Sequence, residues 1–215
     1  MEAVNIPYAG SFEGGLVRKT TVPAFIDELA AKGAAAGEEA GAAAVAKLLN
    51  ETEQPMYIFG NVDGSQENGL VLGEPKVTLG QKFSSSCRPG VTQIYLGGPG
   101  SGSPVHWHND AVNYAVHGSK LWTMLPPPHA VYTRRHAMVD AVQVPLEAAA
   151  RNQSGSVFRC VQHPGDLIYV PDGWGHGVLN LGATAGWAKS FYAPQHMYIH
   201  APHNFVDAGK LKRAL

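Results

Sequence analysis

Cysteine is scarce in this chain: its 215 residues include two, Cys87 and Cys160. They lie far apart in the sequence and form no Cys-x-x-Cys pair, which excludes a cysteine-built zinc knuckle and a thioredoxin-type redox motif. Two interpretations of these residues stay open. They are two buried thiols, or they form a disulfide in an oxidising compartment.

Long apolar runs and an excess of one charge are absent as well. No hydrophobic run approaches the roughly 20 residues of a membrane-spanning helix, and residues 1–10 lack the apolar segment of a secretory signal peptide. The formal net charge is −1, with 16 Lys and Arg against 17 Asp and Glu. That balance indicates no broad surface for nucleic acid or membrane, so we expect neither partner. The sequence as it stands is typical of a cytoplasmic or nuclear protein, whereas an N-terminus trimmed from a longer chain would be compatible with the secretory lumen.

Glycine and proline are frequent instead, with 25 and 15 residues, and 45% of the chain is hydrophobic. Short apolar runs separated by such turn residues favour a mainly β fold over a helical bundle, and the length suits one domain with a substantial core. We expect a single domain over residues 1–215, with a helical part over residues 20–50 and a β core over about residues 76–193. Many short strands joined by tight turns indicate a sandwich or a barrel.

Local patterns predict the individual elements. A helix is predicted over residues 21–31 with Thr21 as its N-cap, followed by an alanine-rich helix over residues 38–50. A short third helix is predicted over residues 146–151. Strands are predicted over residues 56–59, 91–96, 104–108, 111–117, 120–125, 130–133, 156–162, 166–170, 175–181 and 186–192.

Three histidines carry the strongest chemical signal. His106 and His108 stand two residues apart in a predicted strand, where side chains at i and i+2 point to the same side. His176 comes from a distant β-rich segment and could complete a metal site. Two ligands close in sequence and one remote ligand are compatible with an open metal site in a β-barrel.

Several further motifs follow one another along the chain: Ser-Pro-Val-His-Trp-His at 103–108, Gly-Ser-Lys-Leu-Trp at 118–122 and Leu-Pro-Pro at 125–127. In this order they resemble the first half of a JmjC (cupin-like) domain, and residues 165–180 resemble the second half. The resemblance extends over roughly residues 20–193, and the His-Trp-His variant is most similar to the Jumonji domain-containing protein 8 subgroup. It implies a double-stranded β-helix (a jelly-roll, or cupin, fold) with N-terminal helices, and an oxygenase that depends on Fe(II) and 2-oxoglutarate.

The resemblance also implies roles for individual residues. Three histidines occupy the positions of the metal ligands and would form the catalytic centre: His106, His108 and His176. Three residues occupy positions near the cosubstrate: Lys120, Asn113 and Ser103. Tyr95 is a fourth candidate, not through the resemblance but because it lies on the preceding strand and could supply a phenol. Of these, Lys120 would pair with the far carboxylate of 2-oxoglutarate inside the barrel, and the alternative is a lysine that faces solvent from its strand. For the other three, a structural role in a strand or turn is the alternative.

The middle ligand departs from the family pattern. The usual set is two histidines and one carboxylate, and His108 stands where the carboxylate is expected. A neutral imidazole cancels none of the metal charge, and three histidines also suit a zinc ion that activates water. Asp110 is the alternative ligand. It would lie about 13 Å from His106 in a continuous strand, although Asn109-Asp110 is typical of a turn that folds the chain back. We favour His108.

Three hypotheses for function follow. The first is a dioxygenase that hydroxylates a side chain of a protein or peptide substrate. The second is a catalytically altered or inactive JmjC-fold protein that binds metal and acts through protein partners, and the third is a zinc-type cupin. We favour the first, and a hydroxylase over a demethylase, because the chain is small and carries no histone-reader module. The apolar C-terminal residues 191–205 could also pair two subunits into a homodimer.

Overall fold

The structure is a computed structural model, and most of its described residues belong to strands. It describes residues 2–6, 18–21, 24–28, 30, 57–61, 88–133 and 135–192. The elements are β1 (Glu2–Ile6), β2 (Arg18–Thr21), β3 (Tyr57–Asn61), β4 (Arg88–Gly97), β5 (Gly102–His106), β6 (Ala111–His117), β7 (Lys120–Leu125), η2 (Pro127–His129), α4 (Ala137–Ala150), η3 (Ser154–Ser156), β8 (Phe158–Gln162), β9 (Leu167–Val170), β10 (Gly175–Asn180) and β11 (Thr184–Tyr192). The prediction of a mainly β fold is confirmed.

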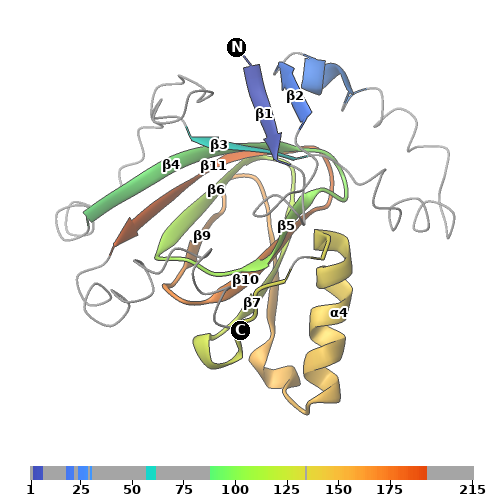
Figure 1. Cartoon of the computed structure of the whole chain (residues 1–215), viewed down its shortest axis with the longest axis vertical. Helices are drawn as coiled ribbons and strands as arrows, with labels where there is room; N and C mark the ends of the chain where they lie inside the picture. Colours follow the sequence, from blue (N-terminus) through green and yellow to red (C-terminus); the bar gives the residue numbers. More distant parts are fainter. Residues whose placement is uncertain are drawn as a thin grey trace, which may run out of the picture.

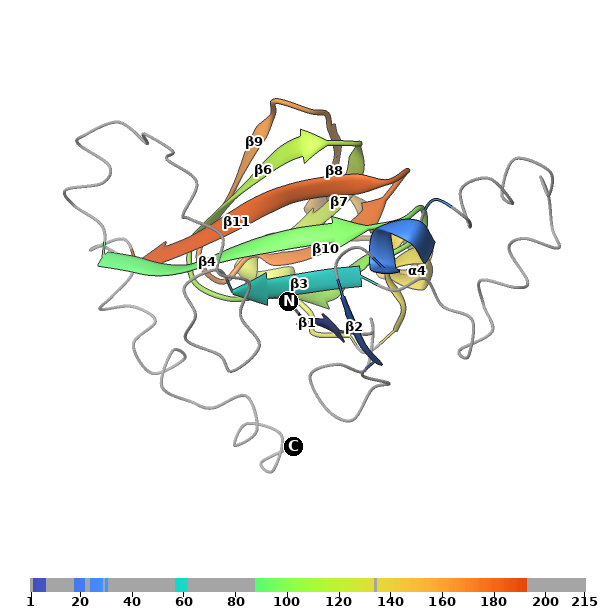
Figure 2. The ribbon, with the colours of Figure 1, turned by 90° about the horizontal axis from the view of Figure 1, so that it is seen from above.

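The strands form two antiparallel sheets, and the chain passes repeatedly from one sheet to the other. The order is β2-β1-β3-β4-β11-β6-β9 in the seven-stranded sheet and β5-β10-β7-β8 in the four-stranded sheet. From β4 to β7, and again from β8 to β11, strands that follow each other in sequence lie alternately in the two sheets, so that β11 pairs with β4 and β10 pairs with β5. Such interleaving is the jelly-roll arrangement that we expected. Figures 1 and 2 show the two sheets curving around a common interior.

The helix α4 covers the outer face of the smaller sheet, where it contacts β5 and β10 (Figure 1). It begins after His136, whose ring accepts a hydrogen bond from the N–H of Met138. The prediction of a short helix over residues 146–151 is wrong, because the helix runs straight through Pro145. A proline inside a helix removes one hydrogen bond, at a cost of about 3 kcal/mol. Burial of Val144 against Val105 and its neighbours offsets that cost.

Other local predictions were corrected by long-range pairing. Thr21, predicted as a helix N-cap, is the last residue of β2, where it pairs with Glu2 of β1. Residues 24–28 are helical. The predicted strand over residues 130–133 does not form. The predicted helix over residues 38–50 lies outside the described residues.

The predicted strand over residues 104–108 ends earlier than expected, and this changes the geometry of the site. β5 stops at His106, so His108 lies in the loop before β6. The argument from alternation, which placed both histidines on one face of one strand, is therefore wrong.

Two further sequence expectations can be compared with the structure. Cys160 is a free, exposed thiol, so neither a buried thiol nor a disulfide describes it, and Cys87 lies outside the described residues. Within the part of the chain that the structure describes, no helix is both long and apolar enough to cross a bilayer.

Candidate metal centre

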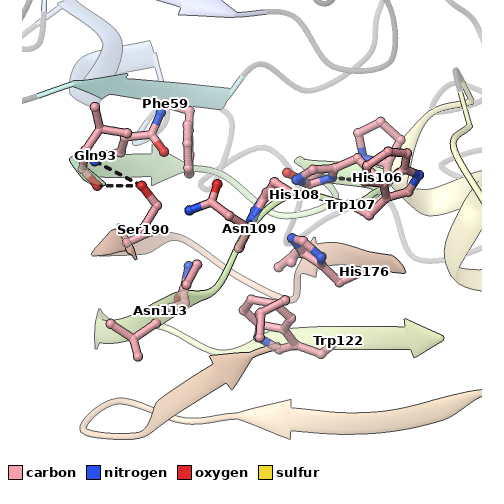
Figure 3. A pocket seen from close by; sticks show the side chains of 18 of the residues that line it. Phe59, Gln93, His106, Trp107, His108, Asn109, Asn113, Trp122, His176 and Ser190 are labelled. Carbon is pink, nitrogen blue, oxygen red and sulfur yellow. Dashed lines mark hydrogen bonds between the residues drawn. The ribbon is translucent and has the colours of Figure 1, made fainter. Parts of the chain in front are cut away.

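The two sheets enclose a cavity of about 450 Å³. Its described lining comes from both sheets, with β3, β4, β6, β9 and β11 on one side and β5, β7 and β10 on the other. His106, His108 and His176 all line it, and Figure 3 shows their imidazoles turned toward one another, with Trp122 beneath His176. The other lining residues are mostly aromatic, aliphatic or uncharged polar side chains.

Strand pairing and one loop bring the three imidazoles together. His176 of β10 stands directly opposite His106 of β5 in the antiparallel register, and their ring centroids are 4.3 Å apart. His108 reaches the same point from the loop after β5, with its ring centroid 4.6 Å from that of His176. One potential ligand atom from each residue lies within 4.8 Å of the others. The structure thus groups the three predicted ligands, although not by the strand geometry that we expected.

Backbone carbonyls orient all three rings. The Nδ1 atoms of His106, His108 and His176 lie 2.8, 2.6 and 3.0 Å from the carbonyl oxygens of Pro104, Asn109 and Trp174, respectively. A carbonyl oxygen only accepts, so each Nδ1 carries the proton and donates it. In the neutral ring the lone pair is then on Nε2, as in histidines that ligate a metal through that atom.

Burial keeps these rings neutral. It lowers the pKa of His106 to about 4, with a smaller contribution from the neighbouring His108. Burial likewise lowers the pKa of His108, and it lowers that of His176 well below its usual value. Neutral imidazoles with converging Nε2 atoms are suited to a divalent cation, because such a metal binds the unprotonated nitrogen.

Asp110 does not join this group. Its carboxylate is completely buried, and its Oδ1 accepts hydrogen bonds from the hydroxyl of Tyr169 at 2.5 Å and from the N–H of Asp172 at 3.3 Å. The turn at Asn109 does fold the chain back, but it directs Asp110 toward β9 and the loop after it. His108 and not Asp110 therefore accompanies His106 and His176.

The four residues assigned to the cosubstrate divide into two pairs. Ser103 and Asn113 line the cavity, and the buried Oδ1 of Asn113 has no hydrogen-bond partner among the described residues. Lys120 and Tyr95 are both buried but are not among the described lining residues. The hydroxyl of Tyr95 donates to the carbonyl oxygen of Tyr114 at 2.9 Å, and burial raises its pKa.

Lys120 is fully enclosed rather than facing solvent. Its exposed fraction is 0%, and its Nζ lies 3.0 Å from the ring centroid of Tyr95 and 5.8 Å from that of Tyr57. The Nζ atom has no hydrogen-bond partner in the described part of the chain. Burial holds the pKa of this amine well below its ordinary value. The alternative of a solvent-facing strand lysine is therefore wrong.

The sequence did not identify several residues that shape the cavity. Trp122 lines it and stacks on the His176 ring at a centroid distance of 6.0 Å. Its position two residues after Lys120 in a strand was a usable signal, because both side chains then face the interior. Phe59, Gln93 and Tyr132 also line the cavity, and nothing in the local sequence indicated this.

Comparison with known proteins gives a consistent set of relatives. The family model described as a cupin-like domain matches residues 11–198. The chain is 35% identical over 112 residues to the arginine-specific demethylase JMJ20 of Arabidopsis thaliana, a match that covers 48% of this chain and 24% of that protein. It is 29% identical over 97 residues to the mouse (Mus musculus) JmjC domain-containing protein 8, covering 43% and 35%.

The longest of these matches is weaker in identity. The bifunctional arginine demethylase and lysyl-hydroxylase psr-1 of Caenorhabditis briggsae is 24% identical over 189 residues, covering 77% of this chain and 48% of that protein. In each of the three cases the match covers less than half of the relative's own length.

Proposed function

The chain belongs to the cupin-like JmjC family, and on this basis we propose that it is an Fe(II)- and 2-oxoglutarate-dependent dioxygenase that hydroxylates a side chain of a protein or peptide. The observation that carries the proposal is the convergence of three neutral imidazoles on one cavity. The relatives' names describe action on arginine and lysyl residues, which supports a protein substrate. The single domain over residues 1–215 and the homodimer stay predictions.

In this proposal the metal is held by Nε2 of His106, His108 and His176. When bound, iron and 2-oxoglutarate supply the oxidation, in which one atom of O₂ enters the substrate C–H bond and the other enters succinate as CO₂ leaves. The protein fixes each imidazole through its Nδ1–H and a backbone carbonyl, so the rings need no reorientation to accept the ion. Three protein ligands leave positions for the cosubstrate and O₂.

One buried polar atom without a partner suits a carboxylate of the cosubstrate: the Nζ of Lys120, which lies buried against Tyr95. The unpartnered Oδ1 of Asn113 only accepts hydrogen bonds, so it does not suit a carboxylate. An unsatisfied buried polar group costs about 1–3 kcal/mol, and a bound carboxylate would remove that cost for the amine. Because Lys120 does not line the cavity, we propose that its amino group turns from the Tyr95 ring toward the ligand. The incoming anion would also restore the protonated form of the amine.

A second candidate is a JmjC-fold protein that binds metal without oxygenase turnover. Two observations favour it: His108 replaces the usual carboxylate, and Lys120 stands away from the described cavity lining. A zinc-type site is the third candidate, since three histidines are a common ligand set for zinc.

The deciding experiment uses the whole chain, freed of metal and reloaded anaerobically with Fe(II). Succinate formation from 2-oxoglutarate is measured with ascorbate, with and without a peptide library, for wild type and for His176→Ala and Lys120→Ala. His129→Ala is the matched control, because His129 lies in η2 and is not among the described cavity-lining residues. We expect turnover in wild type and the control, and loss in the other two variants.

The other outcomes select the other candidates. Binding of iron and 2-oxoglutarate without any succinate formation would contradict the oxygenase proposal. It would support the second candidate, a JmjC-fold protein that binds metal without oxygenase turnover. Stoichiometric zinc with no affinity for 2-oxoglutarate would support the zinc-type site.

A further inference from the structure

Two buried carboxylates stand beside the three-histidine site. The exposed fraction is 0% for Asp110 and 8% for Asp172. Asp110 follows His108 by two residues, and Asp172 precedes His176 by four. Neither is among the described residues that line the cavity, so neither is placed to touch the metal directly.

Asp110 connects the two segments that carry ligands. Its Oδ1 accepts from the backbone N–H of Asp172 and from the hydroxyl of Tyr169. Close by, the N–H of Gly173 donates to the carbonyl oxygen of His108 at 3.0 Å. The loop that holds His108 is thus fastened to the loop that leads into β10, and the negative charge of Asp110 is fixed at that junction.

The electrostatic effect of both carboxylates reaches the His108 ring. Asp110 follows His108 by two residues, and the N–H of Gly173, next to Asp172, donates to the carbonyl oxygen of His108. Both carboxylates favour positive charge on this ring. A group that favours positive charge on this imidazole also favours a cation bound to it, since both add positive charge at the same place. The effect is strongest where water is excluded, as it is around these buried side chains.

We propose that Asp110, with Asp172 beside it, supplies next to His108 the negative charge that a ligand carboxylate would otherwise supply at the metal. This inference rests on the metal site of the proposed function, and it goes further by assigning two positioning residues that act through His108. It explains how a site built from three neutral imidazoles, with no carboxylate in the histidine group, holds a divalent cation.

The test compares the effect of Asp110→Asn in the wild-type protein with its effect in the His108→Asp variant. The metal ions used are Zn²⁺ and Co²⁺, whose binding needs no cosubstrate or O₂. Metal affinity of the full chain is measured by competition with a chelator for wild type, Asp110→Asn, His108→Asp and the double variant. Asparagine keeps an oxygen that can accept from Tyr169 and Asp172 but loses the charge. Replacing a residue that supports a metal ligand without touching the metal typically weakens metal binding about 10- to 100-fold.

We expect Asp110→Asn to weaken binding about 10-fold in the wild-type background and less than about 3-fold in the His108→Asp background. The reason is that a carboxylate at position 108 makes the second charge redundant. We also expect the Fe(III)/Fe(II) potential of Asp110→Asn to become more positive, because ferric iron loses more than ferrous iron when a negative charge is removed. A purely structural role would not shift this potential.

The controls separate charge from folding. Asp166→Asn removes the same charge from an exposed turn and should leave affinity unchanged. Asp172→Asn keeps its backbone N–H bond to Asp110 and should weaken binding as Asp110→Asn does, so it decides the question if Asp110→Asn unfolds. Equal losses in both backgrounds, or wild-type affinity in the two asparagine variants, would overturn the inference alone. Absence of any metal binding by the wild-type protein would overturn the metal site and the inference together.

Discussion

Replacing Lys120 by methionine should stabilise the ligand-free protein while removing its affinity for 2-oxoglutarate. Methionine is unbranched and of similar length, so it can occupy the same space against Tyr95 and Tyr57. What it removes is a buried amine whose Nζ has no hydrogen-bond partner among the described residues. The substitution therefore tests whether this lysine is retained for binding and not for stability.

The size of the effect follows from opposing contributions. A buried polar group without a partner costs about 1–3 kcal/mol. Contact of the Nζ group with the face of Tyr95 returns about 0.5–2 kcal/mol where the amine is protonated, and a methionine sulfur at the same ring returns about 0.3–1.5 kcal/mol. We expect a net gain of about 1–2 kcal/mol for Lys120→Met. For a chain of this length that corresponds to a rise of about 2–8 °C in Tm.

The gain should depend on pH in a defined direction. In the unfolded chain the amine of Lys120 stays protonated up to about pH 10.4, whereas burial holds its pKa well below that value in the folded protein. Between these two pKa values the unfolded chain binds more protons, so the stability of the wild-type protein rises with pH. The advantage of Lys120→Met should consequently be largest toward neutral and lower pH and should shrink as pH approaches 10.

The assay is thermal unfolding of wild type, Lys120→Met and Lys189→Met between pH 6 and pH 9.5. Lys189 is the matched control, a strand lysine of β11 that is partly exposed, and its replacement should give no such gain. Calorimetric titration with 2-oxoglutarate in the presence of Zn²⁺ completes the test, with binding expected for wild type and lost for Lys120→Met. A lower Tm for Lys120→Met at every pH, or a pH-independent difference, would refute the reasoning.

Three further outcomes are expected. Asp140→Ala should cost about 1–3 kcal/mol for each buried donor that it leaves unsatisfied, including the N–H of Val105, which now donates to Asp140 at 2.8 Å; urea unfolding measures this, and a loss under about 0.5 kcal/mol would contradict it. Gly186→Ala should destabilise by about 1–3 kcal/mol or more, because its Cβ would lie 2.2 Å from a backbone oxygen and from a tyrosine hydroxyl, whereas Gly182→Ala meets nothing within 4 Å and should be nearly neutral; equal Tm values for the two would rule this out. Cys160 should react with a thiol reagent in the native protein, and faster as pH rises, because partial burial and a nearby carboxylate raise the pKa of its thiol; labelling only after denaturation would be inconsistent with the structure.

Much of the fold was determined by patterns that act over a few residues. The strands over 111–117 and 120–125 were predicted with the bounds that the structure shows, because apolar alternation and flanking turn residues are local signals. The helix α4 was not, since a proline at position 145 argues locally for a helix start. Packing of α4 on the smaller sheet, which involves residues distant in sequence, decided its true length.

The sequence alone identified His106 and His176 as candidate metal ligands and favoured His108 over Asp110 as the third, because the order of the family motifs does not depend on how the chain is folded. Only the tertiary structure decided how they meet: β10 pairs with β5, and His108 arrives from a loop. It also decided that Asp110 faces Tyr169 and that Lys120 lies against the ring of Tyr95. These positions result from contacts between segments far apart in the chain, and no local pattern of residues encodes which side chain a folded neighbour will meet.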